Sequence, residues 1–204
     1  MEFSYETFSE AWTNSLRLIL SSGEWVQSER GQKTIELRNV SLIALKPFSE
    51  PRIPDKYQFD NDYIEVYCNS FFENNSVNSI SHRLIKYGVK YVNQLESVIG
   101  KLKTNQNTRR AVISLWEPSE DISSQHPPCP IVIQFIIRFD KLEMSVILRS
   151  SDAWMAAIPD YIALTRIQKN VAKELGVNIG KYTQYSISYH IYEFDVMLAR
   201  DSFL

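Results

Sequence analysis

Cys129 is the residue whose surroundings most favour chemistry, because it lies between prolines in the segment His126–Pro130 (HPPCP). A lone cysteine is more often a small buried hydrophobic residue. Here, however, the prolines restrict the backbone at the point where a polar loop meets an apolar run. A thiol that acts as a nucleophile needs a nearby cation that favours its thiolate. Arg149, about twenty residues further on, can supply that cation if the two segments fold back on each other.

The segments that follow Cys129 predict such a fold-back. Ile131–Phe139 and Leu142–Arg149 are both β-rich, and the intervening Asp140–Lys141 is short enough for a hairpin turn. In an antiparallel pair, the start of one strand lies beside the end of the next. We therefore expect Cys129 and Arg149 to share one end of a sheet.

The rest of the chain contributes further helices and strands. Pro47, Pro51 and Pro54 indicate a loop before a helix that begins near Asp62, and the polar run Glu73–Ser81 ends that helix. From the spacing of apolar residues we expect helices at 5–21, 62–72, 89–102 and 162–175 and near the C-terminus, and strands at 33–45, 111–116, 131–139, 142–149 and 182–192. Strands and helices interleave without the βαβ rhythm of a parallel sheet. The predicted fold class is therefore α+β with a large mixed or antiparallel sheet.

Composition and charge limit the kind of protein this can be. The 204 residues are 44% hydrophobic and 23% charged, as in ordinary globular domains. The net charge of -2 argues against a general binder of nucleic acid or anionic membranes, because such proteins usually carry a positive excess. Two cysteines are too few for a disulfide framework, no apolar run is long enough to span a membrane, and the acidic N-terminus is unlike a signal peptide. We expect a soluble, cytoplasmic, single-domain protein over residues 1–204 without a metal site.

Several short motifs occur in an order that resembles the thymidylate synthase family, which includes the deoxycytidylate and cytidylate hydroxymethylases. Between about Thr108 and Asp195 these motifs are Arg109-Arg110, Leu115-Trp116-x-Pro118, Pro127-Pro128-Cys129, Gln134-Phe135, Arg149-Ser150-x-Asp152, Asp160 and His190-Ile191-Tyr192. A weaker match, Arg30-Gly31-x-Lys33-Thr34, resembles the N-terminal phosphate loop of the family with the arginine shifted by one position. The resemblance implies a large mixed β-sheet flanked by helices and a two-fold dimer formed through that sheet.

The resemblance also implies a substrate, a pyrimidine nucleoside monophosphate. In the family, a cysteine thiolate adds to C6 of the base and makes C5 nucleophilic toward a one-carbon electrophile, and Cys129 matches that cysteine. Arg149 and Ser150 match residues that bind the 5′-phosphate, for which the planar, always charged guanidinium is well suited. His190 and Tyr192 match a pair that holds the sugar hydroxyl, and their spacing on a strand places both on the same face.

Other matched residues complete the expected substrate site. Arg109 and Arg110 match a pair that reaches the phosphate in the neighbouring subunit's site, so the resemblance implies a homodimer with shared sites. Asp152 matches a residue whose backbone contacts the base. Gln134 and Ser151 lie within matched motifs, and we count them among the substrate-binding residues.

Asp160 is the position that bears on which base is bound. By its distance from Arg149-Ser150-x-Asp152, it falls where thymidylate synthases carry asparagine and cytidylate-type hydroxymethylases carry aspartate. Cytosine presents an N3 acceptor and an N4 amino donor, which a protonated carboxyl complements with its O–H and C=O. An ionised aspartate facing O4 of uracil would place two acceptors together in a buried site. This favours a cytosine nucleotide, although an aspartate after Pro159 can also be a helix N-cap.

Three parts of the family pattern are altered in this sequence. The catalytic glutamate of the family would fall near Tyr67, and the nearest carboxylate on that predicted helix, Glu65, is the candidate that we assign to this role. The tryptophan-bearing stretch that helps to hold folate is shortened, and after His190-Ile191-Tyr192 the chain ends at Leu204 without the segment that closes over the cofactor in the family. The cofactor 5,10-methylenetetrahydrofolate is therefore implied by the resemblance alone.

The leading hypothesis is a transferase that adds a one-carbon unit, as hydroxymethyl, to C5 of dCMP or CMP through a covalent bond between Cys129 and C6. Two alternatives remain open. The chain can be a divergent thymidylate synthase that acts on dUMP, or a nucleotide-binding member of the family that has lost folate-dependent catalysis. The preference between ribose and deoxyribose is not readable from these residues.

Overall fold

The computed structural model describes residues 1–73, 80–88 and 90–203, and within them seven strands form one mixed sheet. The strand order is β1-β3-β7-β6-β5-β4, and β2 pairs with the first part of β3. The strands are β1 (Glu2–Tyr5), β2 (Glu24–Gln27), β3 (Lys33–Ala44), β4 (Val112–Ser114), β5 (Pro130–Arg138), β6 (Lys141–Asp152) and β7 (Asn178–Tyr192). The helices are α1 (Phe8–Ser22), α2 (Asn61–Phe72), α3 (Ser81–Ile85), α4 (Gln94–Thr104), α5 (Pro118–Asp121), α6 (Ala157–Leu175) and α7 (Glu193–Phe203). The predicted α+β class with a large mixed sheet flanked by helices is confirmed.

The sheet is mixed because two kinds of connection join its strands. β5 and β6 form the predicted antiparallel hairpin, whereas β6 and β7 are parallel and are connected through α6. The turn at Phe139 and Asp140 has positive φ at both residues, as a tight hairpin turn requires. β3 runs antiparallel to β7 over most of its length. As a result, β5 begins at the same end of the sheet where β6 and β7 finish.

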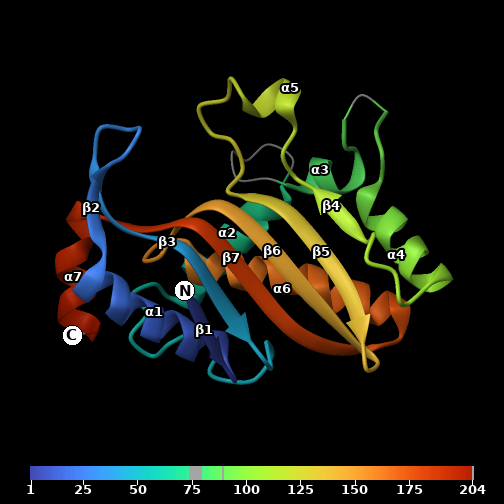
Figure 1. The fold of residues 1–204 in the computed structure, drawn as a ribbon, viewed down its shortest axis with the longest axis horizontal. Coiled ribbons are helices and arrows are strands. Elements are labelled where there is room, and N and C mark those ends of the chain that lie inside the picture. The colour runs from blue at the N-terminus through green and yellow to red at the C-terminus, as the bar shows by residue number, and fades with distance from the viewer. Residues whose placement is uncertain (74–79, 89, 204) are drawn as a thin grey trace.

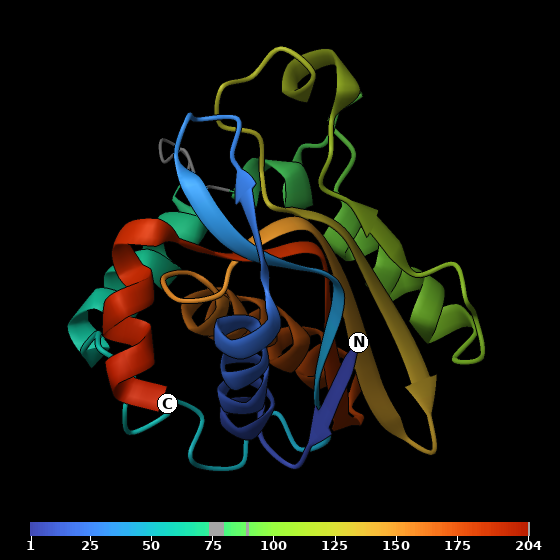
Figure 2. The same cartoon turned by 60° about the vertical axis from the view of Figure 1, so that its left-hand side comes forward.

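Helices α1 and α6 lie against one face of this sheet and bury its core (Figures 1 and 2). Helix α1 is capped by Thr7, whose side chain accepts from the backbone N–H of Glu10 while the Glu10 carboxylate accepts from that of Thr7. Helix α6 ends at Gly176, whose left-handed φ of 66° closes the last turn. The apolar side chains of the two helices and of the sheet's inner face form one continuous core.

The opposite face of the sheet carries partly exposed side chains. Gln134 and Tyr185 lie on this face, and Ile187 is 44% exposed there. Alternation along β5 and β6 sends Ile133 and Val146 to the core and their neighbours to this open face. A sheet with one uncovered, partly apolar face is compatible with the expected two-fold dimer, which remains a prediction.

Several element boundaries differ from those expected. α6 begins at Ala157 rather than at residue 162, because Pro159 lies in the first helical turn, where no backbone donor is required. β7 begins at Asn178, and α4 begins at Gln94. Strands β1 and β2 and helices α3 and α5 were not expected, because four or five residues are too few to show a period. Of the polar run Glu73–Ser81, residues 74–79 lie outside the described residues.

Among the described residues, no helix combines the length and the apolar character needed to cross a membrane. The described residues also contain no group of three or more His, Cys, Asp or Glu side chains placed to hold a metal ion.

Candidate active site

A cavity of about 440 Å³ opens at the end of the sheet where β5 begins and β6 and β7 finish. In Figures 1 and 2 the β2–β3 loop and the segment leading from α5 into β5 rise at this end of the molecule. Nine of the residues predicted from the sequence line the cavity: Arg30, Cys129, Arg149, Ser150, Ser151, Asp152, Asp160, His190 and Tyr192. The mixed topology brings them together, because residues at the start of one strand and at the ends of two others meet there.

Cys129 and Arg149 lie side by side, as the hairpin predicts. The backbone N–H of Arg149 donates to the carbonyl of Cys129 at 2.9 Å, and the Arg149 Nη2 is 4.0 Å from the Cys129 Sγ. The Arg149 guanidinium also donates to the carbonyls of Pro127 and Pro128, at 2.9 Å and 3.1 Å. The proline-rich segment therefore fixes the arginine, and the arginine fixes the segment that carries the thiol.

The thiol itself is less acidic than the sequence argument expected. Burial raises the pKa of Cys129, and the nearby Asp160 carboxylate raises it further, whereas Arg149, the Ser150 hydroxyl and Arg30 lower it. The Ser150 Oγ lies 3.7 Å from the Sγ. Burial outweighs the cations because a thiolate loses its hydration in a confined site. The cation predicted beside Cys129 is present, but the net direction of the pKa shift is upward.

Arg30 reaches the cavity from the loop between β2 and β3. The loop is closed by a hydrogen bond from the N–H of Ser28 to the carbonyl of Gln32 at 2.8 Å, and by one from the N–H of Gly31 to the carbonyl of Ser28 at 3.0 Å. Gly31 has φ of 78°, a conformation that a side chain disfavours. Arg30 and Arg149 both line the cavity, and guanidinium groups are well suited to bind a phosphate.

Asp160 lies in the first turn of α6, is 2% exposed and lines the cavity. It is not the helix N-cap considered above, since the N-cap residue is Ala156 and the N–H of Asp160 donates to the Ala156 carbonyl. The Tyr67 hydroxyl on α2 donates to Asp160 Oδ1 at 2.7 Å. Burial raises the pKa of Asp160 to about 7, and the Tyr67 hydrogen bond opposes this rise. Asp160 can therefore exist in either protonation state at neutral pH.

Asp152 and His190 also line the cavity. They are register partners on β6 and β7. Burial raises the pKa of Asp152 to about 6, although its Oδ1 accepts from the backbone N–H groups of Trp154 and Met155, at 3.0 Å each. Burial also lowers the pKa of His190, against the influence of Glu36, which favours a neutral imidazole that can both donate and accept.

His190 and Tyr192 point into the cavity from alternate positions of β7, with ring centroids 5.2 Å apart. This is the shared face that their spacing predicted. The hydroxyl of Ser151, also on the cavity wall, is buried and has no hydrogen-bond partner among the described residues. A buried hydroxyl without a partner is costly unless a ligand or water satisfies it, so Ser151 is a further candidate contact for a bound molecule.

Glu65 does not line the cavity, which corrects our assignment of this residue to the site. Its carboxylate pairs with Arg166, and its side chain is 56% exposed. On α2, residues two positions apart lie on different faces, so the face that presents Tyr67 to the cavity turns Glu65 away from it. The position expected to hold a carboxylate thus presents a phenol, whose contribution the sequence did not reveal.

Gln134, Arg109 and Arg110 also lie outside this chain's cavity. Gln134 is on the open face of the sheet, where its Nε2 donates to the Arg109 carbonyl at 2.9 Å. Both arginines precede β4, which pairs with β5 at the sheet edge. Within one chain they contribute nothing to the pocket. This placement is compatible with their expected role across a dimer interface, which remains a prediction.

Glu36, Ser188 and Thr34 line the cavity without having been predicted. The Ser188 hydroxyl donates to the Glu36 carboxylate across the β3–β7 pair. Their positions follow from the pairing of distant strands, so no local motif could have indicated them. A single polar residue on an alternating strand carries no signal that distinguishes a site from a surface.

The fold and cavity define an α+β protein with a thiol, a buried carboxyl and two arginines at one end of a mixed sheet. A family model described as "Thymidylate synthase" matches residues 52–202. A "Putative thymidylate synthase" of Methanocaldococcus jannaschii is 34% identical over 194 residues, covering 90% of this chain and 87% of that protein. One from Methanococcoides burtonii is 31% identical over 193 residues, covering 93% and 88%. The chain belongs to the thymidylate synthase family.

Proposed function

We propose that this protein transfers a one-carbon unit, as hydroxymethyl, to C5 of a cytosine nucleotide, dCMP or CMP. The observation that carries the proposal is the location of the Asp160 carboxyl, buried in the same cavity as the Cys129 thiol and with its pKa raised to about 7. A thiol and a carboxyl that faces the base are the two groups needed to activate the ring and to select it.

The residues of the cavity have separate roles in the proposed reaction. The Cys129 thiolate forms a bond to C6, and the electron pair of the C5–C6 bond moves to C5. C5 then bonds to the carbon of the one-carbon donor. Loss of the C5 proton, with cleavage of that carbon's bond to the donor and departure of the protonated donor, leaves an exocyclic methylene at C5, and water adds to this carbon to give the hydroxymethyl group. Loss of the thiolate from C6 restores the ring double bond. Arg149 and Arg30 bind the phosphate, and His190 and Tyr192 bind the sugar.

The protonation state of Asp160 allows it to complement cytosine. Because its pKa is raised to about 7, a neutral carboxyl is available near physiological pH. Such a carboxyl donates to N3 and accepts from the N4 amino group of cytosine. It also avoids leaving a buried carboxylate without a counter-charge, which burial penalises strongly.

The one-carbon donor that the resemblance implies is 5,10-methylenetetrahydrofolate, which when bound supplies a carbon at the oxidation level of formaldehyde. A second hollow of about 100 Å³ lies beside Cys129 and is lined by Tyr67, Phe71 and Pro127 among others. Aromatic and proline surfaces fit the edge of a flat heterocyclic ring. Tyr67 and Phe71 would hold that edge next to the thiol.

Release of tritium from C5 tests the proposal. Nucleotides labelled at C5, namely dCMP, CMP, dUMP and UMP, are incubated with the protein with and without methylenetetrahydrofolate. We expect release from a cytosine nucleotide, its loss in Cys129→Ser and its retention in Cys68→Ala, since Cys68 is fully buried outside the cavity. Release only from uracil nucleotides would contradict the assignment of Asp160.

A thymidylate synthase activity on dUMP is the second candidate. The names of the two relatives favour it, since each is described as a putative thymidylate synthase. It predicts release from dUMP and formation of dTMP, which chromatography of the products distinguishes from a hydroxymethylated nucleotide.

A nucleotide-binding protein without catalysis is the third candidate. The raised pKa of the Cys129 thiol and the absence of a carboxylate at Tyr67 favour it. It predicts nucleotide binding by calorimetry, no C5 exchange, and unchanged binding in Cys129→Ser.

A further inference from the structure

Tyr67 joins two helices at the wall of the cavity. It lies on α2, and its hydroxyl donates to Oδ1 of Asp160 on α6 at 2.7 Å. No other hydrogen bond of this hydroxyl is found among the described residues, and both side chains line the cavity that contains Cys129. The next residue, Cys68, contacts the same helix, with its Sγ 3.8 Å from the Pro159 carbonyl. The hydroxyl is therefore held against one particular oxygen of Asp160.

A neutral carboxyl does not by itself discriminate between cytosine and uracil. The proton of a neutral carboxyl can lie on either oxygen. If the oxygen that faces N3 carries it, the carboxyl donates to N3 and accepts from the N4 amino group of cytosine. If the other oxygen carries it, the carboxyl accepts from N3–H and donates to O4 of uracil. Asp160 needs a neighbour that decides which oxygen keeps the proton.

Tyr67 is placed to determine which oxygen of Asp160 keeps the proton. Burial and the Asp160 carboxylate raise the pKa of Tyr67 well above its ordinary value, so the phenol keeps its proton at any working pH. While it donates to Oδ1, the proton of a neutral Asp160 is favoured on Oδ2, because the carbonyl oxygen of a carboxyl accepts more strongly than its hydroxyl oxygen. If Oδ1 carried the proton instead, the Tyr67 hydroxyl would donate to the weaker acceptor, and the described residues offer it no other partner.

We propose that Tyr67 is a positioning residue that sets base specificity, by fixing Oδ1 of Asp160 as an acceptor for the N4 amino group and directing the Asp160 proton through Oδ2 to N3 of cytosine. This inference rests on the proposed function, and it assigns to Tyr67 the role of determining which Asp160 oxygen carries the proton. Tyr67 touches the base only through Asp160.

The test compares Tyr67→Phe with Tyr63→Phe. Tyr63 lies one turn earlier on α2, its ring is 6.4 Å from that of Tyr67, and no hydrogen bond joins its hydroxyl to Asp160. Binding of dCMP and dUMP is measured by calorimetry from pH 5.5 to 9, and the titration of Asp160 is followed by carboxyl-carbon NMR without nucleotide.

In Tyr67→Phe we expect the ratio of dCMP to dUMP affinity to fall about tenfold, as loss of one charge-assisted hydrogen bond allows. We expect the titration midpoint of Asp160 to rise, because the hydrogen bond that opposes its raised pKa is gone. Tyr63→Phe should leave both unchanged. Incorporation of 3-fluorotyrosine at position 67, which keeps the donor, should restore both values and excludes a loss of folding as the cause.

The outcomes separate this inference from the proposed function. If the wild type prefers dCMP and Tyr67→Phe keeps both the preference and the Asp160 midpoint, only the role of Tyr67 is overturned. If the wild type prefers dUMP, both the cytosine assignment and the direction given to Asp160 are overturned, while the NMR midpoint still shows whether the hydrogen bond acts on Asp160.

Discussion

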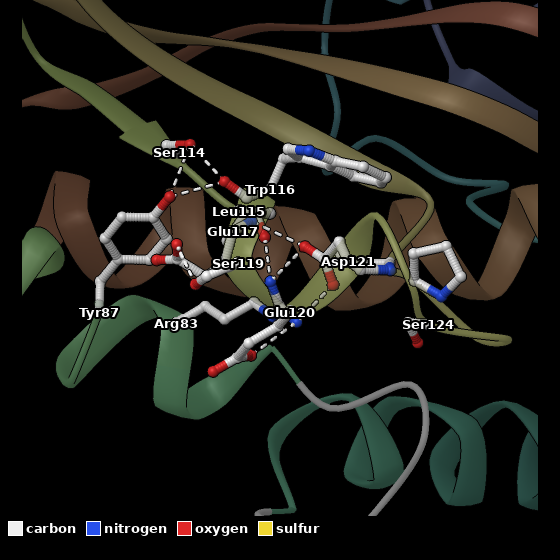
Figure 3. Close-up of polar contacts among 12 residues, drawn as sticks. Arg83, Tyr87, Ser114, Leu115, Trp116, Glu117, Ser119, Glu120, Asp121 and Ser124 are labelled. Atoms are coloured by element: carbon white, nitrogen blue, oxygen red, sulfur yellow. Dashed lines mark hydrogen bonds and ion pairs between the residues drawn. The ribbon is translucent and has the colours of Figure 1, made fainter. Parts of the chain in front are cut away.

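The guanidinium of Arg83 and the carboxylate of Asp121 form a buried bidentate ion pair, with Nη1–Oδ2 and Nη2–Oδ1 distances of 2.7 Å and 2.8 Å (Figure 3). Arg83, on α3, also donates to the carbonyl of Leu115, and Asp121 accepts from the N–H of Glu117. The pair therefore ties α3 to α5, whose last residue is Asp121, and the Leu115 carbonyl ties α3 to the segment between β4 and α5. The loop that leads to Cys129 begins directly after α5.

Removing one partner of this pair should be strongly destabilising. Arg83→Met leaves the Asp121 carboxylate buried without its counter-charge, which typically costs about 3–5 kcal/mol. Urea unfolding of the variant should show this loss. The double variant Arg83→Met/Asp121→Leu should recover most of the stability, since two apolar side chains leave no unpaired charge. A double variant as unstable as the single one would show that the pair stabilises the fold beyond compensating its own desolvation.

Alkylation of the Cys129 thiol should depend on pH. Because burial and Asp160 raise its pKa above the ordinary value, the rate with iodoacetamide should increase about tenfold per pH unit up to pH 9 and beyond. Peptide mass spectrometry assigns the modified residue. Cys68, fully buried and with a pKa raised to about 11, should remain unmodified. A rate that levels off below pH 8 would contradict the upward shift.

Asp160→Asn should change how stability depends on pH. The pKa of Asp160 is about 7 in the fold, above the value of about 4 in an unfolded chain, so the folded state binds the proton more tightly. Wild-type stability should therefore fall as pH rises from about 4 to 7. Asparagine has no such titration and can still accept from Tyr67, so the variant should be more stable than the wild type by about 4 kcal/mol at pH 8 and similar at pH 4. Urea midpoints across this range measure the difference.

Arg110 should act in the partner's site. Its own cavity holds two arginines, Arg30 and Arg149, and the described residues place Arg110 outside it. Sedimentation should show a dimer, and Arg110→Glu should weaken nucleotide binding at least tenfold. Mixing Arg110→Glu with Cys129→Ser subunits should restore activity, because one site of each mixed dimer has an intact thiol and an intact partner arginine. No recovery on mixing would mean that Arg110 acts within its own chain or not at all.

Glu65→Gln should leave C5 exchange within twofold of the wild type. The carboxylate faces away from the cavity and pairs with Arg166 at the surface, and a partly exposed pair contributes little to stability. The matched comparison is Tyr67→Phe, on the cavity side of the same helix. A large loss of exchange in Glu65→Gln would restore the role that the sequence gave to this residue.

Local sequence predicted the parts of the site that depend on local geometry. The β5–β6 hairpin is fixed by two β-rich runs and a short turn, so the meeting of Cys129 and Arg149 followed from counting residues. The shared face of His190 and Tyr192 followed from the two-residue period of a strand. The α+β class followed from the interleaving of helical and strand patterns.

Contacts between distant segments could not be obtained in this way. Which side of α2 faces the cavity depends on how this helix packs against α6. The packing places Tyr67, rather than Glu65, in contact with Asp160. The four-residue strands β1 and β2 were missed because such short strands form only where a longer strand offers its edge.

The sequence by itself determined which chemical groups are available and in what order, because residue identities and the two-residue period of a strand can be read from a short segment of the chain. The tertiary structure alone decided how those groups behave. Burial raised the pKa of Cys129 despite the neighbouring arginine and brought that of Asp160 to about 7. Desolvation depends on everything packed around a group, and that packing comes from elements far apart in the chain.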